Sequence, residues 1–235
     1  MESLSHPNIA RLLEHGYCYV AGRKSLYLAY EFIEGQSLKQ RLRLGGRMLE
    51  SEVLPIGRDI SAAIDALWSQ RIVHGDIKPG NIMLRESGGA VLIDLGILRF
   101  FEERSATKAL TPVSHFAPSL VRPWGTLGYL SPEQARGERL SCASDLFSLG
   151  VVLVECLMGR HPTNGDQRAL AEGISASRLR LDVSSALLGV LDKMLVSTPR
   201  DRGRLSKLSG YFQMMQQSYE EKYSRPASAP QDPSS

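Results

Sequence analysis

The sequence predicts an α+β fold that is mostly helical and has few strands. Residues 51–70 carry apolar side chains at helical spacing, and residues 145–158 are apolar on nearly every face. Between them, short apolar runs at 82–84 and 91–93 flank a turn at 86–89, which is the pattern of a β-hairpin. The chain has 235 residues, of which 43% are hydrophobic and 23% charged, so it can bury a sizeable core.

The remaining elements follow from the same patterns. Residues 26–32, rich in aromatic and aliphatic side chains, are expected to form a strand, and residues 37–43 begin a helix. The long helix at 51–70 then leads directly into a polar loop. Apolar side chains at helical spacing predict a further helix over residues 185–195, which packs behind the one at 145–158.

The C-terminal end differs in composition from the rest of the chain. Serine, proline and alanine dominate residues 224–230, which cannot bury enough apolar area to fold. We therefore expect a folded domain over residues 1–216 and a disordered tail over residues 217–235. No internal repeat is visible.

Two neighbouring loops carry the polar residues that indicate chemistry. They are HGDIKPGNIML at 74–84 and IDLG at 93–96. Asp76 can accept or orient a hydroxyl proton, and Lys78 can place a positive charge beside it. Asn81 and Asp94 offer the hard oxygen donors that magnesium prefers. Because the hairpin joins both loops, these groups are expected at one mouth of one pocket, and they point to phosphoryl transfer.

The two loops resemble the catalytic loop and the metal-binding motif of the protein kinase family. Other segments match the family in order over roughly residues 1–215: His6–Ile9, Leu26–Phe32, Gly125–Glu133, Asp145 and Pro199–Arg202. Each segment alone is an ordinary turn or helix start. Together in the family's order they are specific, because independent turns would not arrange themselves this way.

The resemblance implies a kinase-like α+β fold with a mostly helical large lobe over residues 35–216. Residues 1–34 would then be the last strands of the small lobe and the hinge. It also implies ATP and Mg²⁺ as cofactors, with Asn81 and Asp94 holding the metal. In addition to Lys78, four residues would bind the nucleotide: Tyr30 as gatekeeper, Glu31 and Ile33 through backbone groups, and Met83 beneath the adenine ring.

The resemblance also implies roles around the reacting hydroxyl. Asp76 and Lys78 would be catalytic, and Thr126 would hydrogen-bond to both of them. This lysine and threonine together are typical of the serine/threonine branch rather than the tyrosine branch. Asp145 would brace the catalytic loop. Arg202 would pair with Glu133 at the end of the activation segment.

Three expected family elements do not occur in the sequence: a glycine-rich loop, a lysine on the third strand, and a helix glutamate that pairs with that lysine. Two explanations compete. The chain is either a fragment of a longer active kinase or a catalytically impaired pseudokinase that acts as a docking module. The first is favoured because all four polar groups of the two loops are kept. A fragment that lacks the first strands of the small lobe would also have an open strand edge that exposes Leu26 and Leu28.

Small-molecule phosphotransferases are a third possibility, because their catalytic loop also resembles His-Gly-Asp, as Gly75 gives it here. Lys78, the segment from Gly125 to Glu133, and Asp145 instead favour a protein substrate with a serine or threonine hydroxyl.

The overall composition bounds the partners. A net charge of +3 is too small to indicate nucleic acid. The three cysteines have no metal or disulfide spacing, and Cys156 is expected to be buried. Neither a membrane span nor a signal-peptide core is visible, so a cytoplasmic protein is predicted. The physiological substrate and the oligomeric state do not follow from the sequence.

Overall fold

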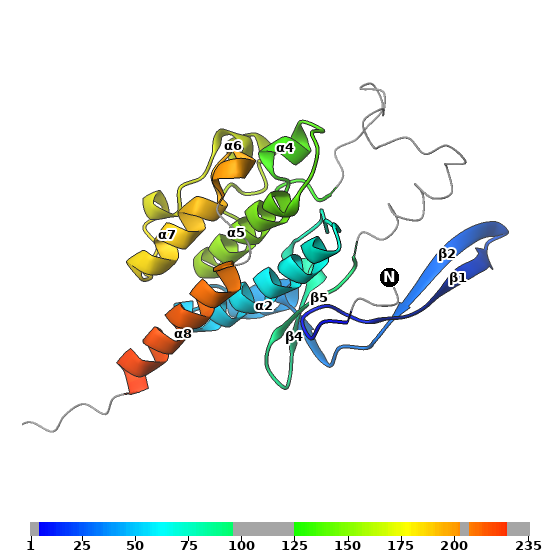
Figure 1. Ribbon diagram of the computed structural model, residues 1–235, viewed down its shortest axis with the longest axis horizontal. Coiled ribbons are helices and arrows are strands. Elements are labelled where there is room, and N and C mark those ends of the chain that lie inside the picture. The colour runs from blue at the N-terminus through cyan, green and yellow to red at the C-terminus, as the bar shows by residue number, and fades with distance from the viewer. Residues whose placement is uncertain (1–4, 96–124, 203–206, 225–235) are drawn as a thin grey trace, which may run out of the picture.

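The computed structural model describes residues 5–95, 125–202 and 207–224. Figure 1 shows a helical body, with a two-stranded ribbon, β1 and β2, projecting from the side that carries β4 and β5. Most of the expected activation segment, residues 96–124, lies outside the described residues. The same is true of residues 225–235, the end of the predicted tail.

The projecting ribbon is an antiparallel pair formed by β1 (Leu12–Val20) and β2 (Arg23–Tyr30). Its two-residue turn has positive φ at both Ala21 (50°) and Gly22 (77°), as a type I′ hairpin turn requires. The strand predicted at 26–32 is therefore present, but it begins earlier, because the turn fixes where pairing starts.

The prediction that this edge exposes Leu26 and Leu28 is wrong. Both side chains are partly buried, and Leu28 packs against the main core. The exposed apolar side chains of the ribbon lie mainly on β1 instead: Leu13, Tyr17, Tyr19 and Val20, with Tyr27 on β2.

A second sheet has the order β3–β4–β5, formed by Gly35–Ser37, Ile82–Arg85 and Ala90–Leu92. Both pairings are antiparallel, which confirms the predicted hairpin. The chain before β1 runs beside β5: the Ala10 amide donates to the Leu92 carbonyl at 2.9 Å, and the Leu92 amide donates to the Asn8 carbonyl at 2.8 Å.

Four of the long helices match the predicted ones: α1 (Leu38–Gly45), α2 (Glu50–Ser69), α5 (Cys142–Met158) and α7 (Ser185–Met194). Two short helices, α4 (Pro132–Ala135) and α6 (Gln167–Glu172), lie beside each other. Helix α5 begins three residues before the predicted start, because the Ser141 hydroxyl caps it by accepting the Ala143 amide. Cys156 is completely buried in it, as predicted.

The last helix, α8 (Leu208–Ser224), packs along α2. Gly57 of α2 makes room for the buried Phe212 ring, whose Cε1 atom would lie 2.6 Å from a Cβ at position 57. Met215 and Tyr219 also pack against the core. The disordered tail predicted from residue 217 is therefore wrong for residues 217–224, which continue α8, with Tyr219 packed partly against the core.

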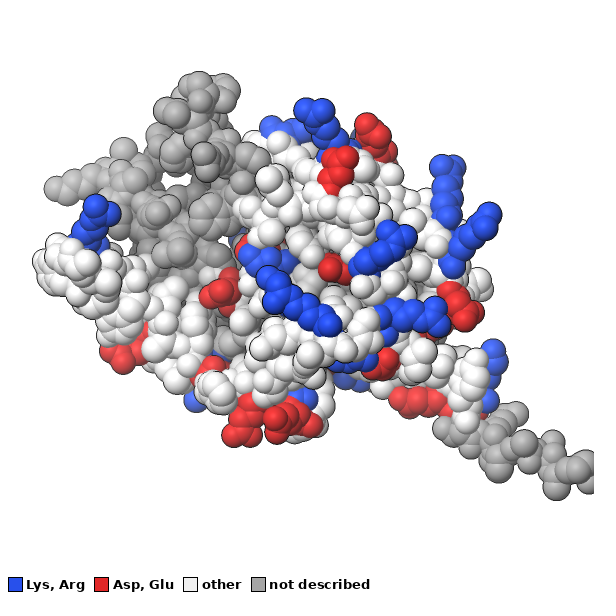
Figure 2. Space-filling model, turned by 180° about the vertical axis from the view of Figure 1, so that it is seen from behind, with Lys and Arg blue, Asp and Glu red and all other residues white. Residues whose placement is uncertain are grey.

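Charges of both signs lie on the face drawn in Figure 2. On the face in Figure 2, acidic side chains lie between the basic ones over much of the body. No helix within the described ranges is both long and apolar enough to cross a bilayer.

Candidate active site

The polar loop after α2 is held by a carboxylate from the first turn of α5. Asp145 accepts the backbone N–H of His74 at 2.9 Å and that of Gly75 at 2.8 Å. Gly75 has a φ of 75°, a conformation that glycine adopts without steric cost. Complete burial raises the pKa of the Asp145 carboxyl, while His74 and the two N–H donors act in the opposite direction. The structure thus shows the brace predicted for Asp145.

Asp76 lies at the centre of a hydrogen-bonded cluster. Its Oδ1 accepts the Thr126 amide at 2.8 Å and the Thr126 hydroxyl at 2.7 Å. Its Oδ2 accepts Lys78 Nζ at 2.7 Å and Asn81 Nδ2 at 3.1 Å. Lys78 Nζ also donates to Thr126 Oγ1 at 2.7 Å. Residues 50 positions apart in the chain therefore form one site, with the contacts predicted for Thr126.

Asn81 and Asp94 can both offer oxygen to a cation. Asn81 Nδ2 is committed to the Asp76 backbone carbonyl and carboxylate, at 2.9 and 3.1 Å, while its Oδ1 has no hydrogen-bond partner among the described residues. The Asp94 side chain is exposed, and the described part of the chain offers it no hydrogen bond or ion pair. The Ile93 amide donates to the Asn81 carbonyl at 3.0 Å, so the two loops are joined.

This donor set fits magnesium. Two hard oxygen donors suffice when phosphate and water complete the coordination. Over residues 5–95, 125–202 and 207–224, no group of three or more His, Cys, Asp or Glu side chains is arranged to hold a metal by itself. A cation bound between Asn81 and Asp94 would therefore depend on oxygens of a bound phosphate.

The predicted nucleotide residues lie on one side of this site. Tyr30, Ile33 and Met83 belong to one small apolar cluster with Val91. The Glu31 amide donates to the Arg11 carbonyl at 2.9 Å, whereas the Glu31 carbonyl and the Ile33 amide have no hydrogen-bond partner in the described chain. One acceptor and one donor are thus left for a planar ligand.

Tyr30 lies close enough to Asp94 to be influenced by its charge. Its hydroxyl is buried and has no hydrogen-bond partner among the residues that the structure describes. Burial raises the pKa of Tyr30 to about 12, and the nearby charge of Asp94 adds to this shift.

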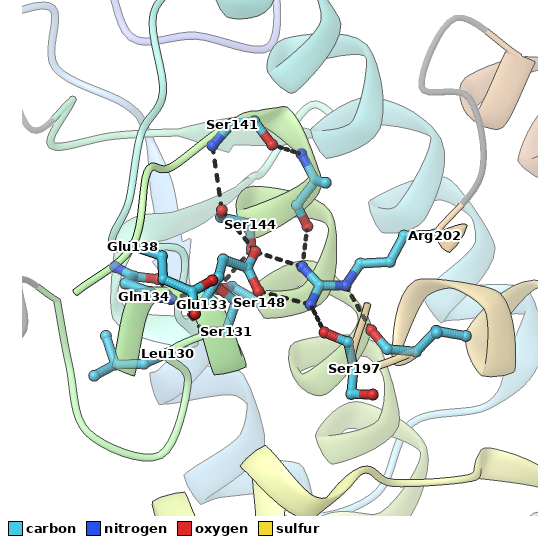
Figure 3. Close-up of polar contacts among 12 residues, drawn as sticks. Leu130, Ser131, Glu133, Gln134, Glu138, Ser141, Ser144, Ser148, Ser197 and Arg202 are labelled. Atoms are coloured by element: carbon cyan, nitrogen blue, oxygen red, sulfur yellow. Dashed lines mark hydrogen bonds and ion pairs between the residues drawn. The ribbon is translucent and has the colours of Figure 1, made fainter. Parts of the chain in front are cut away.

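The segment that carries Thr126 is anchored by a buried ion pair. Figure 3 shows the Arg202 guanidinium facing the Glu133 carboxylate, with two parallel hydrogen bonds of 2.6 and 2.7 Å. Both side chains are at most 2% exposed. The other N–H groups of Arg202 reach the backbone carbonyls of Ala143, Val196 and Ser197 at 2.6–2.9 Å, so all five donors are used.

Two further interactions stabilise this ion pair. The guanidinium lies 4.8 Å from the centre of the buried Phe147 ring. Burial alone would raise the pKa of Glu133, but the hydrogen bonds from Arg202, its own backbone and Ser144 outweigh burial and lower it. The structure thus contains the predicted pairing of Glu133 with Arg202, in a form that is fully satisfied.

Comparison with known proteins identifies the family. The model of the protein kinase domain family matches residues 1–219, which is nearly all of the chain. The chain belongs to the protein kinase family. It is similar to the serine/threonine-protein kinase PrkC of Bacillus subtilis, with 34% identity over 78% of this chain and 26% of that protein.

Other relatives agree. A probable serine/threonine-protein kinase PknB of Lactococcus lactis is 34% identical over 71% of this chain and 24% of its own length. PknB of Mycolicibacterium smegmatis is 30% identical over 85% of this chain and 32% of its own length. This kinase-family chain therefore spans a quarter to a third of the length of these curated relatives, which are serine/threonine kinases by name.

The fold agrees with a solved structure. The kinase domain of Mycobacterium tuberculosis PknI matches with a TM-score of 0.65 and 22% identity, over 91% of this chain and 74% of that one. This likeness shows the protein kinase fold, as the sequence predicted.

Several contacts around this site were not predicted. Gln134 Nε2 donates to the Gly75 carbonyl at 2.6 Å, and Gln167 bonds both Gly128 and Leu130. These partners are backbone atoms, so no pairing of side-chain types could have revealed them.

Proposed function

We propose that this chain binds Mg-ATP and transfers the γ-phosphoryl group to a serine or threonine hydroxyl of a protein substrate. The observation that carries the proposal is the cluster of Asp76, Lys78 and Thr126, in which every polar side-chain atom is oriented by another. Transfer of a phosphoryl group needs positioned groups and charge more than covalent catalysis, and such a cluster provides them.

Asp76 acts on the substrate hydroxyl. A carboxylate has about four acceptor positions, and all four are filled here by Thr126, Lys78 and Asn81. The incoming hydroxyl must therefore displace one donor. Lys78 is the donor that moves, because its ammonium group ends a flexible stem whereas the other two are held by backbone or amide geometry. Its charge then lies near the transferring phosphate.

The nucleotide is held by the hinge and the metal loop. The free Glu31 carbonyl and Ile33 amide bind the adenine edge, between Tyr30 and Met83. Asn81 and Asp94 would hold the magnesium ion, which neutralises charge on the phosphate oxygens when bound.

A protein substrate is favoured over a small molecule. The segment that presents Thr126 is continuous with Glu133, which is tied to Arg202. That anchor provides a rigid surface beside Asp76 on which an extended peptide can lie.

Two linked measurements test the proposal. The first is the melting temperature of the chain with and without Mg-ATP, at concentrations up to about 1 mM, the upper end of usual KM values. The second is transfer of labelled γ-phosphate to mixed serine- and threonine-containing peptides. We expect a magnesium-dependent rise in melting temperature, and slow transfer.

Matched variants define the controls. Asp94→Asn should abolish the magnesium-dependent rise, and Asp76→Asn should keep it but lower transfer by about 10²- to 10⁴-fold. Asp182→Asn changes an exposed aspartate outside the site and should alter neither. A folded chain with neither rise nor transfer would contradict the proposal and favour a docking module without catalysis.

A further inference from the structure

The segment next to Thr126 is held from its far side by a histidine. His161 follows α5 and lies in the turn that leads to α6. Its Nε2 lies 2.8 Å from the Gly128 carbonyl, and its ring meets Tyr129 edge-to-face, with centroids 5.1 Å apart. Gly128 is only two residues from Thr126.

The second ring nitrogen fixes which atom carries the proton. Nδ1 accepts the Gly165 amide at 2.9 Å and the Thr163 amide at 3.2 Å. An atom that faces two N–H donors must be an acceptor, so Nε2 carries the hydrogen and donates it to the Gly128 carbonyl. His161 therefore links the turn at 161–165 to the Thr126 segment through one ring.

The space around Gly128 is closed by the same turn. Gly128 has a φ of 94°, and a Cβ at that position would lie 3.2 Å from Gly165 Cα and 3.4 Å from His161 Nε2. The Gly128 amide is also taken, by Gln167 Oε1 at 3.0 Å. Both backbone polar groups of Gly128 are thus bound, the carbonyl by His161 and the amide by Gln167.

The held segment is short and turns sharply. The Tyr129 amide donates to the Thr126 carbonyl at 3.1 Å, so Thr126 and Gly128 belong to one tight turn. Thr126 in turn contacts Asp76 and Lys78. A displacement of Gly128 would therefore move the hydroxyl of Thr126 relative to Asp76.

We infer that His161 is a positioning residue for phosphoryl transfer, which donates from Nε2 to the Gly128 carbonyl and so fixes Thr126 against Asp76. The inference deepens the proposed function and rests on it for its kinetic consequence. Its structural part, the fixing of the 126–130 turn by the Nε2 donor, can be measured without any catalysis.

Two substitutions test the roles of the two ring nitrogens separately. In His161→Asn the side-chain oxygen can replace Nδ1 as acceptor in the turn, but nothing reaches Gly128. In His161→Gln the longer side chain places an amide N–H near the former Nε2 position. His161→Phe keeps the ring beside Tyr129 and loses both polar functions, so it serves if the asparagine variant does not fold.

The full chain and these variants are compared by amide hydrogen exchange over residues 126–130 and by steady-state kinetics, well below their melting temperatures. We expect faster exchange in His161→Asn and His161→Phe. We also expect kcat/KM for the peptide to fall by about 5- to 10-fold, the usual effect of one hydrogen bond, with the KM for ATP unchanged. His161→Gln should recover most of both losses.

The outcomes keep the inference separate from the proposed function. Wild-type exchange at 126–130 in folded His161→Asn overturns the inference, whether or not the chain is active. Faster exchange with an unchanged kcat/KM also overturns it, since a merely structural role would behave this way. If the wild-type chain transfers no phosphate, the proposed function fails, and the exchange experiment alone decides whether His161 fixes the turn.

Discussion

The α5 region and the β1–β2 ribbon differ in the partners of their side chains. Around the start of α5, the buried polar groups of Asp145, Glu133 and Arg202 have close partners from distant parts of the chain. The ribbon is held mainly by pairing between its own two strands, and it leaves large side chains such as Tyr19 (76% exposed) in solvent.

The two regions are therefore held in place by different interactions: buried polar contacts around α5, and strand pairing in the ribbon. In the α5 region, Asp145 holds the loop at His74 and Gly75, and Arg202 holds Glu133. Removing one partner of such a buried pair leaves the other polar group where water cannot solvate it. The ribbon reaches the body near its base, where Leu28 and Tyr30 join the core. A two-stranded ribbon is marginally stable by itself. Three variants test how far this contrast holds, starting with the largest expected effect.

Glu133→Ala should destabilise the chain by about 3–5 kcal/mol, because it leaves the Arg202 charge buried without its partner. Urea unfolding followed by circular dichroism measures the change. Glu138→Ala is the control, since its ion pair with Arg136 is 52% exposed on both sides, and we expect no measurable change in its midpoint. Equal effects of the two variants would show that the buried pair is not special.

Gly57→Ala should cost about 1–3 kcal/mol, because the new methyl group would press on the Phe212 ring and push α8 away from α2. Gly189→Ala, in helix α7, is the matched control. It has open space around the added Cβ and should stabilise the chain by about 0.5–1 kcal/mol. Thermal unfolding of both variants measures the effects. Similar stability of the two would mean that α8 is not part of the cooperative unit.

Replacing Leu13, Tyr19 and Val20 together by threonine should change the free energy of unfolding by less than about 0.5 kcal/mol per position, because all three are exposed and threonine suits a strand. Light scattering at high protein concentration should fall, since exposed apolar patches promote association. A much larger loss of stability would show that these ribbon side chains contribute to folding as the buried groups of the body do.

The sequence allowed most of the polar site to be predicted. The contacts of Thr126 with Asp76 and Lys78 and the pairing of Glu133 with Arg202 join side chains of complementary chemistry. Such pairs leave a signal in residue type and order. The brace at Asp145 bonds backbone N–H groups, and it was predicted only from its resemblance to the family motif.

Contacts to backbone atoms were not predictable in this way. His161 recognises a carbonyl and two amides, which every residue carries, so its neighbours along the chain give no hint. The end of α8 was missed for another reason. Phe212, Met215 and Tyr219 have helical spacing, but the many glutamine and glutamate residues around them obscured it.

The pairing of Glu133 with Arg202 has a consequence for synthesis of the chain. The two residues are 69 positions apart. At about 5–20 residues per second, a ribosome needs roughly 3–14 s to add the arginine after the glutamate. During that time Glu133 lacks its partner, so the segment that carries Thr126 can be anchored in its final position only after Arg202 has been added.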